Sequence, residues 1–169
     1  MTSPEGRCAC GDVRYRLIAA PMIVHACHCR DCQRLTGSAF ALNLWIERKF
    51  VEAEGGAPVA FAVPPGSSGR PHDVFACARC GTHLWNKYHA APGDTVLLCG
   101  GTLDDPASIS PDVHIFTRSK LPWLDLPKGA RVFNAFYRID EVWPPESLAR
   151  WRQLTAASPG AAPNPTAAR

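Results

Sequence analysis

No long apolar run occurs in this 169-residue sequence. The longest candidates, residues 96–99 and 130–136, have the length of strands, whereas a bilayer span needs roughly 20 apolar residues. The N-terminal residues 1–8 also lack the apolar core of a secretory signal peptide. These absences argue against a membrane protein and predict a cytoplasmic location.

A strong excess of one charge is also missing. The sequence has 18 Lys and Arg residues against 15 Asp and Glu residues, which leaves a net charge of +3. The basic residues are scattered rather than gathered in a stripe, so no nucleic-acid partner is expected. With 46% apolar and 20% charged residues, the composition is typical of one soluble globular domain.

What the sequence does have is 8 cysteines, and all but one of them fall into short clusters. In the reducing compartment expected here, clustered cysteines favour metal binding over disulfides. The remaining cysteine, Cys99, lies in an apolar run and is expected in the core. The clustered cysteines are Cys8 and Cys10, then Cys27, Cys29 and Cys32, and finally Cys77 and Cys80.

Four of these thiols form a candidate structural zinc site. Cys8 and Cys10, two apart on an expected strand, would point to the same face. Cys77 and Cys80 would be brought around one metal by a tight turn, and Gly81 permits a left-handed backbone there. Four thiolates satisfy tetrahedral zinc and leave no open position. A redox function for the C-x-x-C pair is the weaker alternative, because no βαβ pattern surrounds it.

The other three thiols form a candidate catalytic zinc site. Cys27 and Cys29 would share a strand face, and Cys32 would return through a turn. Three protein ligands leave the fourth position free for a substrate thiol, which the metal would hold deprotonated. His25 shares strand parity with Cys27 and Cys29, so it could close the site, although a position beside the metal is favoured for it. An empty redox centre is the weaker alternative.

Short segments in which apolar and polar residues alternate dominate the chain, and such segments predict half-buried strands. Gly, Pro, Asn and Asp residues separate them. The pattern predicts a mainly β fold with antiparallel sheets, arranged as a sandwich or a rolled barrel. The expected strands are residues 13–17, 39–46, 50–53, 59–63, 73–76, 84–88, 95–99, 113–117 and 132–138.

One helix is expected near the C-terminus, at residues 144–155. Pro145 suits a first helical turn, and Leu148, Trp151 and Leu154 form one apolar stripe. Residues 156–169 have almost nothing to bury and are expected to be disordered. We therefore expect a zinc-binding catalytic domain over residues 1–143, a C-terminal helix over 144–155 and a disordered tail over 156–169.

Five sequence blocks, in their order along residues 6–126, resemble the glutathione-dependent formaldehyde-activating enzyme family, also called the centromere protein V family. The C-terminal helix and tail lie outside these blocks. The blocks are Gly6-Arg-Cys8-Ala-Cys10-Gly11-Asp-Val13-Arg-Tyr15, Cys27-His-Cys29-Arg-Asp-Cys32-Gln-Arg-Leu-Thr36-Gly37-Ser-Ala-Phe40, Phe75-Ala-Cys77-Ala-Arg-Cys80-Gly81-Thr-His-Leu84, Gly101-Thr-Leu-Asp104-Asp105-Pro106 and His114-Ile-Phe-Thr-Arg-Ser119-Lys-Leu-Pro-Trp123.

The resemblance implies a fold similar to the Mss4-like (β-tent) zinc-binding architecture, with antiparallel sheets and short helices, and with two Zn²⁺ per chain. It implies condensation of glutathione with formaldehyde to S-(hydroxymethyl)glutathione, a carbon–sulfur lyase reaction in the reverse sense, with a small thiol and an aldehyde as partners. By motif position, Cys8, Cys10, Cys77 and Cys80 match the structural-zinc ligands, and Cys27, Cys29 and Cys32 match the catalytic-zinc ligands.

Further residues are candidates for the substrate site. A substrate carboxylate could bind to four basic side chains, although surface charge is the favoured interpretation of each. His114 is a candidate proton shuttle, with a hydrogen-bonded sheet histidine as the favoured alternative. Of three tryptophans that could line a cleft, Trp45 and Trp85 are expected in the core and Trp123 is not. The basic candidates are Arg30, Arg34, Arg118 and Lys120.

Two other functions fit parts of the pattern. A zinc-stabilised protein-binding or chaperone-like module without turnover would have the same scaffold, and closure of the three-cysteine site by His25 would favour it. A methionine sulfoxide reductase would need a reactive cysteine in a polar setting. Cys99 lies in an apolar run, so this function ranks last.

Overall fold

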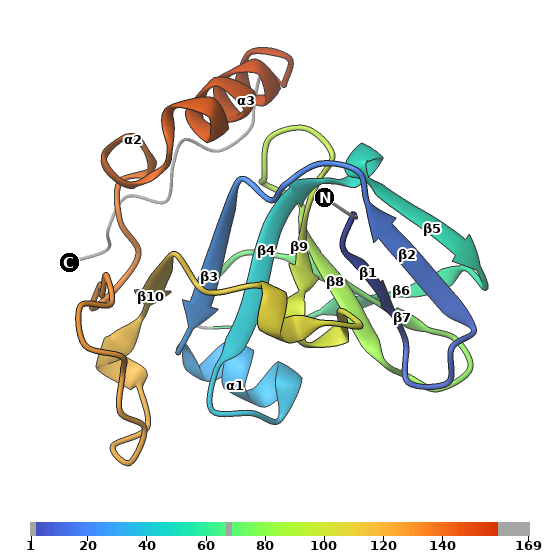
Figure 1. Cartoon of the computed structure of the whole chain (residues 1–169), viewed down its shortest axis with the longest axis horizontal. Helices are drawn as coiled ribbons and strands as arrows, with labels where there is room; N and C mark the ends of the chain where they lie inside the picture. The colour runs from blue at the N-terminus through green and yellow to red at the C-terminus, as the bar shows by residue number, and fades with distance from the viewer. Residues whose placement is uncertain (1–2, 67–68, 159–169) are drawn as a thin grey trace.

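The computed structural model describes residues 3–66 and 69–158, and these residues fold into two β-sheets with short helices (Figure 1). The smaller sheet has the strand order β1-β2-β5, and the larger sheet has the order β10-β3-β4-β9-β8-β7-β6. The strands are β1 (Glu5–Arg7), β2 (Val13–Leu17), β3 (Ile23–Cys27), β4 (Ala41–Glu47), β5 (Val51–Gly55), β6 (Pro58–Val63), β7 (His72–Cys77), β8 (His83–Tyr88), β9 (Thr95–Cys99) and β10 (Val113–Ile115).

Neighbouring strands are antiparallel in both sheets, with one exception. β10 runs parallel to β3, with Val113 opposite His25 and Ile115 opposite Cys27. In β2, the buried residues Val13, Tyr15 and Leu17 alternate with exposed arginines, as expected of a sheet with one solvated face. β3 is buried at all five positions, because both faces of the larger sheet are covered at this strand.

Two apolar cores cover the two faces of the larger sheet. The first core lies between the sheets and joins Tyr15 of β2 to Leu44 and Leu98 of the larger sheet. The second core lies on the opposite face and joins Trp45 and Leu97 to the C-terminal segment. Because side chains alternate along a strand, residues 44 and 45 belong to different cores.

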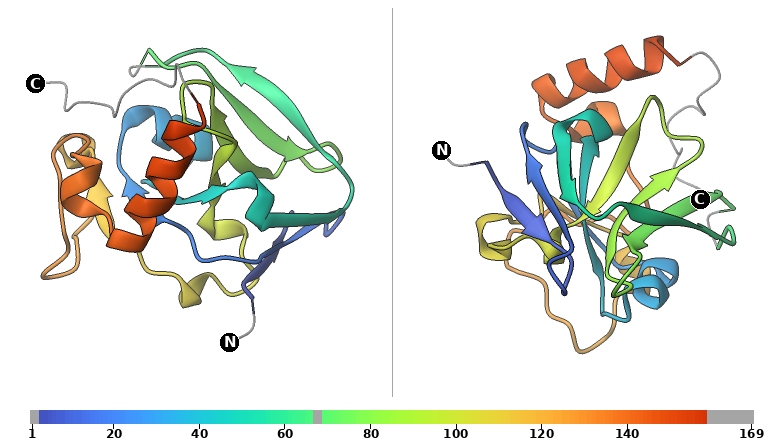
Figure 2. Two further views of the ribbon diagram at one scale, coloured as in Figure 1. Left: turned by 90° about the horizontal axis from the view of Figure 1, so that it is seen from above. Right: turned by 90° about the vertical axis from the view of Figure 1, so that its right-hand side faces the viewer.

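The helices are short, and the longest lies over the second core. They are α1 (Arg30–Thr36), α2 (Ile139–Val142) and α3 (Pro145–Ala156), with 3-10 turns η1 (Arg48–Phe50), η2 (Gly100–Thr102), η3 (Pro106–Ser108) and η4 (Thr117–Ser119). Figure 2 shows α3 lying across one end of the larger sheet. In α3, Arg150 forms an ion pair with the buried carboxylate of Glu47 in β4. None of the helices in the described ranges is long and apolar enough to cross a bilayer.

The predicted mainly β class is confirmed, and the strands predicted at 13–17 and 95–99 have the predicted bounds. The strand predicted at 132–138 is wrong: in that segment Val132 forms only an isolated bridge with His114, because the chain turns to pack aromatic side chains into the second core. The predicted short helices are present, but the sequence pattern does not locate one at Arg30–Thr36, where α1 lies. The predicted C-terminal helix is present and extends to Ala156. Of the tail predicted over residues 156–169, residues 159–169 lie outside the described residues. The Mss4-like assignment stays a prediction.

Candidate metal centres

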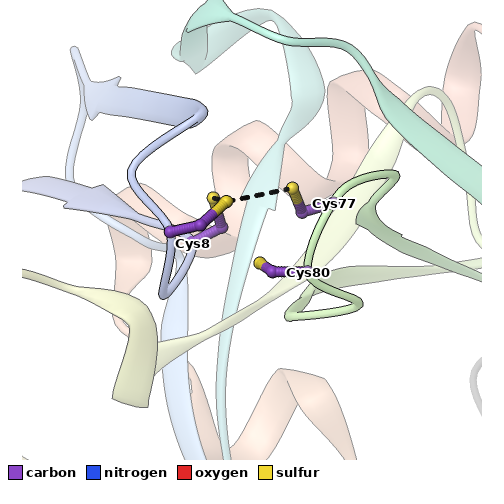
Figure 3. A group of neighbouring side chains, drawn as sticks. Cys8, Cys77 and Cys80 are labelled. Atoms are coloured by element: carbon purple, nitrogen blue, oxygen red, sulfur yellow. Dashed lines mark hydrogen bonds between the residues drawn. The ribbon is translucent and has the colours of Figure 1, made fainter.

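The first cluster joins the two sheets. Cys8 and Cys10 lie in the turn between β1 and β2, and Cys77 and Cys80 lie at the turn between β7 and β8. Figure 3 shows Cys8 on one side of the cluster and the labelled Cys77 and Cys80 on the other. The four sulfur atoms lie within 4.8 Å of one another. Cys8 and Cys10 were expected on a strand; they converge instead because the chain turns back toward β2.

Hydrogen bonds within and between the two turns hold this cluster in shape. The backbone N–H of Val13 donates to the Cys8 sulfur at 3.2 Å. Thr82 links the two turns, because its hydroxyl accepts from the N–H of Ala9 at 3.0 Å and contacts the Cys80 sulfur at 3.1 Å. Gly81 has a φ of 72°, the left-handed conformation predicted for it.

The geometry of this set fits zinc. Zn–S bonds of about 2.3 Å in a tetrahedron place sulfur atoms about 3.8 Å apart. The Cys8–Cys10 and Cys10–Cys77 sulfur separations are 3.5 and 3.9 Å. All eight cysteines are free thiols in this structure. The four sulfurs could therefore hold a metal ion such as Zn²⁺.

The second cluster forms at the junction of β3 and α1. Cys27 ends β3, Cys29 is the N-cap of α1, and Cys32 lies in its first turn. The Cys29 sulfur accepts a hydrogen bond from the N–H of Cys32 at 3.4 Å, and it lies 3.5 Å from the sulfur of Cys27. The three sulfurs also fall within 4.8 Å of one another. Cys29 was expected on the strand. It is instead the N-cap of α1, and the first turn of this helix returns Cys32 to the cluster.

The surroundings of Cys29 favour a thiolate. Hydrogen bonds from Cys27 and Cys32 lower the pKa of Cys29 to about 3, and the first N–H groups of a helix favour negative charge at its N-terminus. Hydrogen bonds with Cys29 and Cys32, together with burial, raise the pKa of Cys27. Cys29 is thus the thiol of this cluster that ionises most readily, and a bound metal would allow all three thiols to ionise.

His25 does not join the three sulfurs. Among the described residues, the metal-compatible group at this position consists of the three cysteines alone. The Nε2 atom of His25 instead shares a hydrogen bond of 2.5 Å with the Tyr137 hydroxyl, which also accepts from the indole of Trp143 at 2.7 Å. Burial lowers the pKa of His25 to about 3, so this histidine is neutral. The fourth-ligand alternative therefore has no support in the geometry.

A cavity of about 790 Å³ adjoins the three-cysteine cluster. All three of these cysteines line it, and so do Arg30 and Arg34 of α1 and Arg118 of η4. The sequence pattern did not single out Arg70 or Tyr88, which also line the cavity. Neither is in a cysteine motif; only the folding of β7 and β8 beside β9 brings them there.

Lys120, Trp123 and His114 do not line this cavity. The amino group of Lys120 donates to the carbonyls of Leu121 and Leu124. Trp123 is 70% exposed, so its expected place at the cleft is wrong. His114 shares a 3.0 Å hydrogen bond with His28 and is a buried sheet histidine, the favoured alternative. Trp85 is buried in the first core as expected.

Two residues of β4, Asn43 and Trp45, also line the cavity. Trp45 is buried as predicted and also lines the cavity. The Asn43 amide donates toward the Cys32 sulfur at 3.9 Å. Asn43 was not among the predicted site residues, although its even spacing from Trp45 along β4 assigns both to one face.

Cys99 is half-buried, and burial raises the pKa of its thiol to about 12.

Comparison with known proteins gives one family. Residues 3–119 match the family described as "Glutathione-dependent formaldehyde-activating enzyme". A Halomonas elongata protein named for the same activity is 24% identical over 151 residues, which cover 87% of this chain and 92% of that protein. A crystal structure of a Rhodobacter sphaeroides protein aligns with a TM-score of 0.44 and 19% identity, over 63% of this chain and 91% of that chain.

Proposed function

Because the chain belongs to the glutathione-dependent formaldehyde-activating enzyme family, we propose that it catalyses the reversible addition of a thiol such as glutathione to an aldehyde such as formaldehyde. In the direction of adduct cleavage this is a carbon–sulfur lyase reaction. The observation that carries the proposal is the convergence of Cys27, Cys29 and Cys32 at the wall of a cavity, with no fourth ligand from the described residues.

The two cysteine clusters have different roles in this proposal. Cys8, Cys10, Cys77 and Cys80 hold a structural zinc with a complete set of four ligands. Cys27, Cys29 and Cys32 would hold a catalytic zinc, which would lower the pKa of a substrate thiol and so favour its thiolate form.

The residues of the cavity bind and orient the two reactants. The thiol sulfur attacks the carbonyl carbon, so that a C–S bond forms and the C=O double bond becomes a C–OH single bond. The proton lost by the thiol ends on that oxygen, and no oxidant or reductant is needed. Arg30, Arg34 and Arg118 line the cavity beside the cysteines and are placed to bind the carboxylates of the thiol substrate. The Asn43 amide orients the Cys32 sulfur.

NMR exchange spectroscopy tests the proposal. We expect the wild-type protein to accelerate exchange between formaldehyde, glutathione and their adduct. The Cys29→Ser variant should return the exchange to the rate without protein, because it removes one of three ligands. The Cys99→Ala variant is the matched control and should retain the acceleration, because Cys99 lies in neither cluster. No acceleration by the wild type with glutathione or any other small thiol would leave the zinc-stabilised binding module as the function.

A further inference from the structure

The cavity continues well past the cysteine cluster along one face of the larger sheet. Cys27 and His25 point to this face from β3, and Asn43 of β4 lies opposite His25. The next rung holds Trp45, opposite Ile23 in β3, and Leu97 of β9, opposite Trp45. Because a strand rises roughly 3.3 Å per residue, this rung lies about 13 Å along the sheet from Cys27.

The chemistry of the cavity wall changes along this distance. The cysteine end has arginines from α1 and η4 at its rim. The far end is apolar: Trp151 of α3 packs edge-on against Trp45 with ring centroids 5.3 Å apart, beside Leu97 and Ala91. Asn86 of β8, which lies opposite Leu97, forms the polar edge of this end of the cavity. Nearer the middle, Phe136 lies edge-on to His25, with centroids 5.8 Å apart.

Glutathione and formaldehyde leave this far end without a ligand. The formaldehyde carbon bonds directly to the sulfur, which is held at the cysteine end. The carboxylates of glutathione would lose their hydration among Trp45, Leu97 and Trp151 without gaining a cation, which is costly. They belong with the arginines. The apolar end therefore fits a part of the substrate that neither glutathione nor formaldehyde provides.

We propose, on the basis of the proposed function, that the aldehyde substrate of this protein carries an aromatic substituent that binds in the cavity against Trp45, Leu97 and Trp151. Ring-lined walls favour an aromatic ligand through edge-to-face and offset packing. Phe136 and Trp151 both lie beyond residues 3–119, the range of the family match, so the C-terminal segment supplies part of this wall. The reaction is the same addition: a C–S bond forms, C=O becomes C–OH, and the thiol proton moves to oxygen.

Propanal and 3-phenylpropanal form a matched pair of probes, because they differ only by the phenyl ring and have similar carbonyl groups. With glutathione as the thiol, exchange spectroscopy on the full-length, metal-loaded protein should give a rate enhancement for 3-phenylpropanal at least about tenfold greater than for propanal, since burying a phenyl ring is favourable. Formaldehyde is measured alongside.

Two variants alter the apolar end. Ala91→Trp should fill it, and Trp151→Ala should remove one wall; each should reduce the preference for 3-phenylpropanal over propanal by about tenfold. Trp123→Ala removes an exposed tryptophan outside the cavity and should retain the preference. Saturation-transfer NMR with 3-phenylpropan-1-ol, an unreactive analogue, provides a measurement independent of turnover: its ring signals should show transfer with the wild type and lose it with Ala91→Trp.

The outcomes separate this inference from the proposed function. Acceleration of formaldehyde and propanal with no preference for 3-phenylpropanal would overturn the inference alone. No acceleration for any of the three aldehydes would overturn both. A preference that is equal in the wild type, Ala91→Trp and Trp151→Ala, or an analogue signal unchanged by Ala91→Trp, would place the aromatic substituent elsewhere and would also overturn the inference.

Discussion

The two cysteine clusters use the same ligand atom in opposite structural settings. The four-cysteine cluster joins turns that are distant in sequence, with Cys10 and Cys77 separated by 67 residues. The three-cysteine cluster is confined to six consecutive residues at the end of one strand and the cap of one helix. The first therefore ties the two sheets together, whereas the second is attached to a single place in the larger sheet.

The clusters also differ in what surrounds them. Cys8 and Cys77 belong to the core between the sheets, and none of the four cysteines lines the large cavity. Cys27 belongs to the second core, and its whole cluster lines that cavity. A metal that completes its coordination and cross-links a core contributes to folding, whereas an incomplete set beside a cavity is suited to chemistry.

The largest expected effect comes from breaking the four-cysteine cluster. Cys77→Ser should lower the free energy of unfolding by about 5 kcal/mol or more, because the binding energy of a structural zinc is also folding energy. Circular dichroism during urea titration measures the loss. Cys99→Ala, outside both clusters, should stay folded. Equal stability of the two variants would contradict a structural role for the four-cysteine cluster.

Removal of metal by a chelator should separate the two clusters by rate. The purified protein should contain two zinc ions per chain, and the ion at the three-cysteine cluster should leave first, because it has fewer protein ligands and faces the cavity. Elemental analysis after timed chelation, with circular dichroism on the same samples, should show one ion lost while the fold is retained. Loss of both ions together with unfolding would mean that the two sites do not differ as proposed.

A smaller effect is expected from removing the hydrogen bond that supports a single metal ligand. Asn43→Leu removes the amide that donates toward the Cys32 sulfur and should weaken zinc binding at this cluster about tenfold, a typical cost of losing a hydrogen bond to a metal ligand. Competition with a coloured chelator measures the affinity. Asn86→Leu changes an asparagine that lines the same cavity two strands away; it should leave the affinity unchanged, and a similar loss in both variants would indicate a general disturbance of the cavity.

Most strands could be predicted from the sequence because the alternation of apolar and polar residues depends only on local geometry. Two segments show where this rule stops. Residues 132–138 contain strand-like residues, but Phe136 and Tyr137 stack on each other in the second core, so tertiary packing overrides the propensity. Helix α1 is only seven residues long, with Cys29 as its N-cap and Cys32 in its first turn, so it offers too little apolar periodicity to be recognised.

Of the candidate site, only the sulfur ligands could be predicted from the sequence. Spacings of one or two residues place Cys27, Cys29 and Cys32 close together whatever the rest of the fold does. The opposite holds for His25: its strand parity suggested a ligand, yet Tyr137, 112 residues away, holds its ring nitrogen. The cavity likewise depends on residues from β4, β9, α1 and α3, which no single stretch of sequence brings together.

The sequence by itself determined which thiols could act together, because short covalent spacings limit how far apart neighbouring sulfurs can lie. Only the tertiary structure decided that Cys8 and Cys10 meet Cys77 and Cys80, since that contact requires the two sheets to pack face to face. The same packing decided that the three-cysteine cluster borders a cavity with an apolar far end. Contacts between distant segments follow from how whole faces bury apolar area, and no local spacing contains that information.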